Sequence, residues 1–250
     1  DWSDAFASRF SHAADAETQI RAARSIIEFQ DYFAAVLRDK QANPTDDVIS
    51  VIAGAMEPQP VGEDALTLPQ ALQLCQQILV AGNESTASTI SEGMVMLLRD
   101  RPDLLPAVRD DAKVRQDFIE EVLRLHSAVN TMWRVTTEDT ELGGVAMPKG
   151  SLVLLRFGAA NRDEAMFERA DALCPGRDND RKHVAFGFGV HMCIGAQLAR
   201  AELDVAFARL LGRLRGWRLA DGAELHHNPS IVVRALATLP LEFDPAPTLP

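Results

Sequence analysis

A single cysteine, Cys193, stands between a glycine-rich turn and the start of a helix, and this arrangement constrains the chain more than any other feature. Residues 185–195 read AFGFGVHMCIG, and the amphipathic pattern over residues 196–214 predicts a strong helix directly after them. Gly187 and Gly189 permit a tight, left-handed turn. The free N–H groups and the positive end of the helix favour a thiolate over a thiol at Cys193. The pattern therefore predicts a cysteine that acts as a ligand.

Three other interpretations of this loop compete with a ligand cysteine. A free cysteine is often a small, buried hydrophobic side chain. Gly187 and Gly189 also begin a dinucleotide-binding fingerprint, but Met192 stands where the third glycine of that fingerprint belongs. Cys193 with His191 two residues away would suit a hydrolase, but no convincing third group or oxyanion loop accompanies the pair. The number of fixed positions in the loop favours the ligand.

The composition is that of an ordinary globular protein, and it excludes some classes of function. The chain has 250 residues and a net charge of −11, which argues against a general nucleic-acid binder. Its three cysteines (Cys75, Cys174 and Cys193) are a poor disulfide framework, which predicts a reducing, cytoplasmic compartment. No apolar run reaches the roughly 18 residues of a membrane span. The polar start does not resemble a signal peptide, and it lacks Met, so we expect a fragment.

The first half of the chain is predicted to be helical. Helical spacing of apolar residues predicts helices at 16–41 and 46–55, followed by a loop at 57–66. Thr67 and Gln70 have the spacing of a capping box at the start of the next helix. That helix continues for roughly thirty residues, and its apolar content at 74–81 predicts that it is buried and central. The poor helix formers at 82–86 are expected to interrupt it.

The second half of the chain changes character. Two further helices are expected at 102–110 and 117–126, and β-branched and aromatic residues then predict short strands at 133–137 and 151–155. An irregular stretch at 163–183 precedes the cysteine loop, and the tail at 217–243 again predicts short strands. These patterns indicate a mainly α fold with small β-sheets, in a single partial domain over residues 1–250.

The cysteine loop resembles that of the cytochrome P450 family, which has the spacing Phe-Gly-x-Gly-x-His-x-Cys-x-Gly followed by Leu-Ala-Arg. The resemblance implies a P450 fold that lacks its N-terminal part, and a haem b cofactor whose iron is ligated by Cys193. By position, Phe186 would pack beside the thiolate and His191 would hydrogen-bond a haem propionate. Gly187 and Gly195 belong to the same cofactor-binding loop, where a missing side chain lets a flat group approach the backbone.

The sequence AGNEST, which begins at Ala81, resembles the oxygen-binding stretch on the long central helix of the family. Ala81 and Gly82 would leave room for dioxygen, and a hydroxyl bonded back to a carbonyl would open the helix. Glu84 as the acid and Ser85 as the alcohol imply a proton relay. Because the family usually has threonine where Ser85 stands, the hydroxyl of Thr86 is an alternative member. A loop or cap between two ordinary helices is the simpler interpretation.

Two further features match charged residues of the family. Glu121 and Arg124 lie three apart on a predicted helix and match its Glu-x-x-Arg motif, whose structural ion pair would include Arg177 as a third member. Glu120 has the wrong spacing for this motif and is expected to be solvated. Arg134 matches an arginine that pairs with a haem propionate, although a surface strand arginine is the simpler interpretation.

The resemblance implies a haem-thiolate monooxygenase that inserts one oxygen atom from O2 into a small or medium apolar substrate. Residues 78–85, 128–133 and 231–233 would line the substrate side. A ferredoxin- or flavodoxin-type protein would supply electrons, and no nucleic-acid or membrane partner is expected. Two alternatives stay open: a peroxide-driven haem-thiolate enzyme, and a haem-binding fragment without catalytic activity. The candidate docking residues for the electron donor are Arg109, Lys113, Arg115, Arg181, Lys182 and His183.

Overall fold

The computed structural model describes residues 2–7, 15–58 and 64–245. The chain divides into two compact units, Asp1–Glu84 and Ser85–Pro250, each with its own apolar core. The boundary between the units falls within one long helix. Asp1 and part of the loop expected at 57–66 lie outside the described residues. The expectation of one partial domain stays a prediction.

The first unit is helical, as its apolar spacing predicts. It contains α1 (Trp2–Ala7), α2 (Ala16–Ala42) and α3 (Val48–Gly54). Asp15 and Asp47 cap α2 and α3, because each carboxylate accepts a hydrogen bond from a first-turn amide. Edge-to-face contacts of the Phe29 ring with Trp2 and Phe6 join α1 to α2. The buried core of this unit comprises Phe6, Phe29, Leu37, Ile52, Ala53, Ala71 and Cys75.

The long helix α4 (Leu68–Val95) begins where the capping signature places it. The backbone N–H of Thr67 donates to Oε1 of Gln70 over 2.8 Å. The predicted interruption at 82–86 is wrong, because the helix is continuous there. The hydroxyls of Thr89 and Ser91 bond back to carbonyls four residues earlier, and a carbonyl accepts such a bond on its second lone pair. The helix leaves α geometry only at its end, in the π-helical turn Met96–Asp100.

The prediction that residues 74–81 are buried is also wrong. Leu74 is 40% exposed and Ile78 is 52% exposed. Only the face that carries Ala71 and Cys75 packs into the core of the first unit. Apolar content shows what a helix is able to bury, whereas the neighbours of each face decide what it does bury.

The helical part of the second unit packs around α6. After the short 3₁₀ turn Pro102–Leu104 come α5 (Leu105–Asp110) and α6 (Ala112–His126), while α8 (Ala196–Arg213) follows the cysteine loop. Asp111 caps α6, which therefore begins earlier than predicted. The rings of Phe118 and Phe207 meet edge to face at 5.5 Å between α6 and α8. The buried core comprises Met94, Leu97, Val108, Phe118, Ile119, Val122, Leu123, Leu125, Leu173, Leu203, Phe207 and Leu211.

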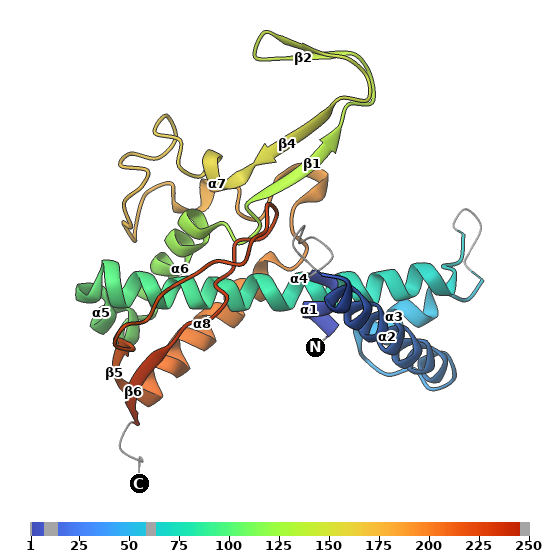
Figure 1. Ribbon diagram of the computed structural model, residues 1–250, viewed down its shortest axis with the longest axis horizontal. Coiled ribbons are helices and arrows are strands. Elements are labelled where there is room, and N and C mark those ends of the chain that lie inside the picture. Colours follow the sequence, from blue (N-terminus) through green and yellow to red (C-terminus); the bar gives the residue numbers. More distant parts are fainter. Residues whose placement is uncertain (1, 8–14, 59–63, 246–250) are drawn as a thin grey trace. The chain divides into compact units, whose positions relative to one another are not determined.

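The strands of the described residues form small antiparallel pairs. The β1–β4 ribbon leads outward to the β2–β3 hairpin, and β5 and β6 lie together near the described end of the chain (Figure 1). The mainly α prediction with small sheets is confirmed. The pairs are β1 (Thr131–Val135) with β4 (Leu152–Arg156), β2 (Thr140–Leu142) with β3 (Val145–Met147), and β5 (Leu214–Leu219) with β6 (Leu241–Pro245). A short helix, α7 (Phe157–Ala160), follows β4.

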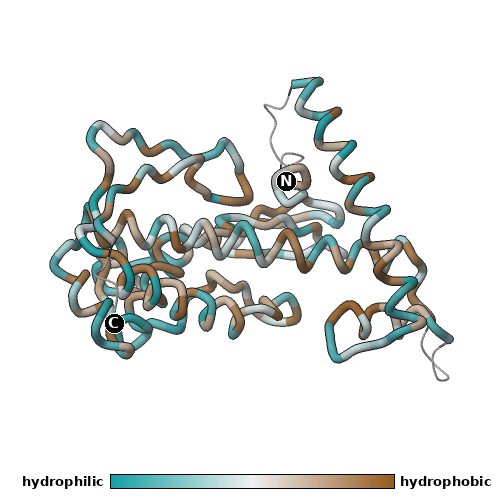
Figure 2. Tube along the Cα trace, turned by 90° about the horizontal axis from the view of Figure 1, so that it is seen from below, coloured by the Kyte–Doolittle hydropathy of each residue, from teal (hydrophilic) through white to brown (hydrophobic). Residues whose placement is uncertain are grey.

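Polar and apolar residues alternate along the long helices (Figure 2). Among the described residues, none of the helices combines the length and the apolar content that crossing a bilayer requires.

Candidate functional site

The cysteine loop is a tight turn held by its own backbone. The N–H of Cys193 donates to the carbonyl of Phe186 over 2.8 Å, and the N–H of Gly187 donates to the carbonyl of Val184 over 2.9 Å. Gly187 and Gly189 have φ angles of 71° and 68°, which confirms the predicted left-handed turn. These bonds fix the path of the chain on either side of the cysteine.

Helix α8 starts immediately beyond the cysteine. Gly195 is its N-cap residue, and no side chain caps the first turn. The N–H of Ala196 donates to the carbonyl of Cys193 over 3.3 Å. A β-carbon at Gly195 would lie 3.8 Å from the Cys193 sulfur. The sulfur therefore lies beside the amino end of a helix, which carries partial positive charge.

The side chains around the sulfur fit a large, flat, apolar group. Cys193 is exposed, Phe188 is 86% exposed and Val190 is 98% exposed, and Ile194 is fully exposed beside them. Such apolar groups are normally covered in a folded protein. A thiol ringed by uncovered apolar side chains is a donor set suited to the iron of haem, which would cover them.

His191 and Arg134 are the two groups expected at the haem propionates. His191 ends the short 3₁₀ turn Gly189–His191 and is exposed. Arg134 lies on β1, where its guanidinium donates to the carbonyl of its neighbour Trp133 over 2.8 Å. Within the described residues, neither side chain makes an ion pair, and no hydrogen bond joins Arg134 to the cysteine loop. Both are therefore available to a carboxylate.

Glu121 and Arg124 lie together and are fully buried, and the partly buried Arg177 lies against them. The guanidinium of Arg124 holds the carboxylate of Glu121 with two bonds of 2.7 and 3.0 Å, and Nε of Arg177 donates to the same carboxylate over 3.1 Å. Burial alone would raise the pKa of Glu121, but hydrogen bonds from Arg124 and from the amide of Cys174 outweigh it and lower the pKa. Arg124 also donates to the carbonyls of Asn161, Ala170 and Ala172, which ties α6 to the irregular segment.

Glu120 was expected to be solvated, and that expectation is wrong. Its carboxylate is buried and accepts two bonds from Arg200, of 2.6 and 3.0 Å, and one from His183 of 3.1 Å. Burial opposes the charge, but the bonds from His183 and Arg200 lower the pKa of Glu120 to about 2. Spacing within one motif could not reveal these partners, since they lie 63 and 80 residues further along the chain.

A second buried polar network joins α4, α6 and the tail. Ser88 donates to the carbonyl of Arg234 over 2.6 Å and lies 2.6 Å from Nε2 of His126. Since the hydroxyl hydrogen of Ser88 is used, Nε2 of His126 carries the hydrogen of a neutral ring. Nδ1 of His126 has no hydrogen-bond partner among the described residues and lies 3.8 Å from Glu92. Glu92 also contacts His227. No pattern in the sequence predicted this network.

The buried imidazole predicts acid sensitivity. Burial, with help from the charges of Arg234 and His227, lowers the pKa of His126 from 6.5 to about 3. Below about pH 6.5 the unfolded chain binds a proton that the folded chain does not, so stability is complete above that pH and falls as pH decreases. We expect a loss of about 2 kcal/mol between pH 7 and pH 5. Urea unfolding at the two pH values measures it.

The variant His126→Gln isolates this effect, because glutamine can still donate to Ser88 and does not titrate. Its unfolding free energy should fall much less over the same pH range. An equal fall in the variant and in the parent chain would assign the pH dependence to other groups of the network, such as Glu92, His227 and Arg234.

The structure places the predicted relay residues on one continuous helix. Ala81, Gly82 and Glu84 belong to the first unit, and Ser85 and Thr86 belong to the second. The hydroxyl of Thr86 reaches the carboxylate of Glu202 on α8 over 3.4 Å. This contact brings Thr86, within the second unit, to the helix that follows Cys193.

The predicted basic docking residues do not form a free patch. His183 is buried against Glu120, and Arg115 is buried against Asp204 at 2.7 Å, so neither is available at a surface. Acidic neighbours pair with Arg109 and Lys113 as well. The prediction is wrong for His183 and Arg115, which the fold buries against carboxylates, whereas for Arg109 and Lys113 it stays a prediction. The residues of the set that remain exposed are Lys113, Arg181 and Lys182.

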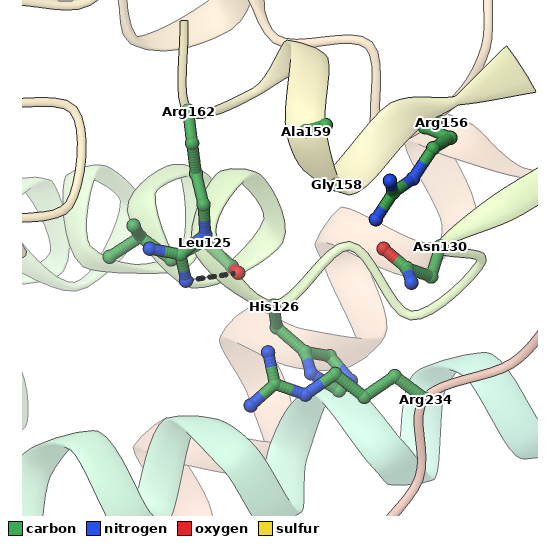
Figure 3. A pocket seen from close by; sticks show the side chains of 8 residues that line it. All are labelled: Leu125, His126, Asn130, Arg156, Gly158, Ala159, Arg162 and Arg234. Atoms are coloured by element: carbon green, nitrogen blue, oxygen red, sulfur yellow. Dashed lines mark hydrogen bonds between the residues drawn. The ribbon is translucent and has the colours of Figure 1, made fainter.

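A pocket of about 220 Å³ lies at the end of α6, and three arginines line it: Arg156, Arg162 and Arg234 (Figure 3). Arg162 donates to the carbonyl of Leu125 over 3.0 Å. Two of these arginines already face carboxylates, since Arg162 pairs with Asp171 and Arg234 lies 3.9 Å from Glu92.

This pocket is separate from the propionate position expected at Arg134. Arg156 pairs with Thr131 in the β1–β4 ladder, and Arg134 pairs with Val153. Because side chains alternate between the two faces of a strand, Arg156 and Arg134 lie on opposite faces of this ribbon. Arg156, and the side of the pocket that it lines, therefore lie on the face of the ribbon opposite to Arg134.

Comparison with known proteins places the chain in a family. A family model described as Cytochrome P450 matches residues 15–221. A steroid C26-monooxygenase of Mycobacterium tuberculosis (strain CDC 1551 / Oshkosh) is 36% identical over 251 residues, covering 99% of this chain and 65% of that protein. A steroid C26-monooxygenase of Mycolicibacterium smegmatis is also 36% identical, over 99% of this chain and 61% of its own length.

Solved structures agree with the family match. The cytochrome P450 CYP109Q5 from Chondromyces apiculatus superposes with a TM-score of 0.82 at 35% identity, over 98% of this chain and 58% of that one. This chain belongs to the cytochrome P450 family. It spans 65% or less of the length of each of these proteins.

Proposed function

We propose that this chain is the haem-binding part of a monooxygenase and that Cys193 is the axial ligand of the iron of haem b. The observation that carries the proposal is an exposed cysteine on a hydrogen-bonded loop, among uncovered apolar side chains and beside a helix start. The name of the steroid C26-monooxygenase relative supports the reaction class. The proposed haem-contacting residues are Ala81, Gly82, Arg134, Phe186, Gly187, His191, Cys193 and Gly195.

When bound, haem supplies the binding and reductive activation of dioxygen. In the proposed overall reaction, one oxygen atom of O2 enters a C–H or C=C bond of the substrate. The other atom leaves as water after taking up two electrons and two protons. The proposed source of the electrons is a ferredoxin- or flavodoxin-type protein. The three free cysteines support a reducing, cytoplasmic compartment.

The proposed substrate is a small or medium apolar molecule. Two of the three predicted lining segments lie side by side in the second unit. Val129 pairs with Val233, and the N–H of Asn130 donates to the carbonyl of Val232 over 2.8 Å. The hydroxyl of Thr131 donates to the carbonyl of Ile231 over 2.6 Å. The apolar valines and isoleucine of these segments support an apolar substrate.

Proton delivery is assigned to Glu84, with the hydroxyl of Ser85 or Thr86 as its partner. The variant Glu84→Ala is expected to leave haem uptake unchanged and to increase the oxygen consumed per product formed. Parallel measurement of oxygen uptake and product tests this, with Asn83→Ala as the neighbouring control. Unchanged coupling in Glu84→Ala would remove Glu84 from the relay.

The absorption spectrum of the haem-reconstituted, dithionite-reduced protein under carbon monoxide tests the proposal. Thiolate ligation gives a Soret band at the red-shifted position that characterises this family. A band at the ordinary histidine–haem position, or no uptake of haem, would contradict the proposed function of this chain.

A further inference from the structure

Glu120 connects α6 to both sides of the cysteine loop. Its carboxylate accepts Nε of Arg200 over 2.6 Å and Nη2 over 3.0 Å, one bond on each oxygen. A two-bond arginine–carboxylate pair fixes the direction of the guanidinium as well as its distance. Since Arg200 lies near the start of α8, Glu120 determines where this guanidinium points.

The guanidinium of Arg200 lies over the ring of Phe186, with its central carbon 4.6 Å from the ring centre. A cation over an aromatic face is attracted by the ring quadrupole. The carbonyl of Phe186 in turn accepts the N–H of Cys193 over 2.8 Å. A continuous series of contacts therefore leads from Glu120 through Arg200 and Phe186 to the backbone of the cysteine.

His183 provides a second connection. Its Nδ1 accepts the N–H of Ala185 over 3.2 Å, so Nε2 carries the hydrogen and donates it to Glu120 over 3.1 Å. The N–H of Val184 donates to the side chain of Asn161 over 2.7 Å. Residues 183–186, which lead into the loop, are thus anchored to buried groups. Most of residues 188–194 are exposed, so the loop depends on this anchored arm.

We infer that Glu120 is a positioning residue for the cysteine loop, which it holds through Arg200 and His183. The inference deepens the proposed function, because it rests on that function for the role of Cys193. It concerns the carboxylate outside the Glu-x-x-Arg pair: Glu121 and Arg124 tie α6 to the irregular segment, whereas Glu120 fixes the loop itself.

The chain offers a matched control for this inference. Nε of Arg115, on α6, donates to Asp204, on α8, over 2.7 Å. This pair joins the same two helices, and among the described residues its hydrogen bonds go to Val108 and Arg109 rather than to the loop. Asp204→Asn therefore weakens the packing of α6 on α8 alone, whereas Glu120→Gln weakens that packing and releases Phe186 as well.

Amide hydrogen exchange of the haem-free chain, followed by mass spectrometry of peptides covering residues 184–195, tests the inference. In Glu120→Gln, the bonded amides of Gly187, Met192 and Cys193 should exchange at least about tenfold faster than in Asp204→Asn, once rates are corrected for unfolding free energy. Arg200→Lys keeps the positive charge but loses the planar guanidinium that makes two bonds to Glu120. Its exchange rates should therefore fall between those of Glu120→Gln and Asp204→Asn. Equal corrected rates in all three variants would overturn the inference.

Two further measurements separate this inference from the proposed function. If Glu120 acts through Arg200 and His183, Glu120→Gln should accelerate the loop amides less in Arg200→Gln than in the parent chain, because only the connection through His183 is then left to lose. In the haem-loaded protein, Glu120→Gln should lose haem to an acceptor protein about tenfold faster than Asp204→Asn, and similar loss rates would contradict the inference. Failure of the parent chain to take up haem would contradict the proposed function and leave the exchange result valid.

Discussion

Replacing Arg124 by methionine is expected to lower the free energy of unfolding by about 3–5 kcal/mol, which is much of the stability of an ordinary domain. The guanidinium of Arg124 is fully buried and supplies two of the bonds to Glu121, together with bonds to three carbonyl groups of the irregular segment. Without it, a buried carboxylate keeps only Arg177 and the amide of Cys174. Urea unfolding followed by circular dichroism measures the loss.

Arg99→Met is the control for this prediction, because Arg99 pairs with Asp100 at the surface. An exposed pair contributes less than about 1 kcal/mol, so this variant should unfold close to the parent chain. A loss of similar size in both variants would show that the enclosed position of Arg124 is not what makes its ion pair important.

Replacing Cys193 by alanine is expected to abolish the thiolate-type Soret band of the reduced, carbon monoxide-bound protein completely. Alanine keeps the backbone N–H that donates to Phe186 and the turn at Gly187 and Gly189, so the loop should keep its path. What disappears is the one thiol of the loop. Because the iron ligand sets the position of the band, any haem that still binds should give a different spectrum.

Cys174→Ala is the matched control. Cys174 is half-buried in the irregular segment, and its contact with Glu121 is made by its backbone N–H, which alanine retains. This variant should show the band of the parent chain. A thiolate-type band that survives in Cys193→Ala, or disappears in Cys174→Ala, would contradict the assignment of Cys193 as the iron ligand.

Local chemistry determined much of this protein from its sequence. The caps at Asp15 and Asp47 and the capping box at Thr67 fixed the starts of helices, because a side chain satisfies amides only a few residues away. The left-handed turn at Gly187 and Gly189 followed from the lack of a β-carbon. The pairing of Glu121 with Arg124 followed from one helical turn.

The same local reasoning failed where the outcome depended on distant neighbours. Nothing near Glu120 in the sequence distinguishes a solvated carboxylate from the buried one that Arg200 and His183 surround. The burial of His126 against Ser88 could not be predicted from the sequence for the same reason. Arg115, expected in a basic surface patch, is neutralised by Asp204 on another helix.

Sequence by itself therefore determined several helix starts and the cysteine turn, and it showed that the loop matches the pattern of a known family. Only the tertiary structure decided which charges are buried, which face of α4 is covered, and how the cysteine loop is anchored to α6. The physical reason is the distance along the chain over which each effect acts. Backbone conformation and capping are set by atoms within a turn of the chain, whereas the free energy of a buried charge depends on partners that folding brings from any distance along it.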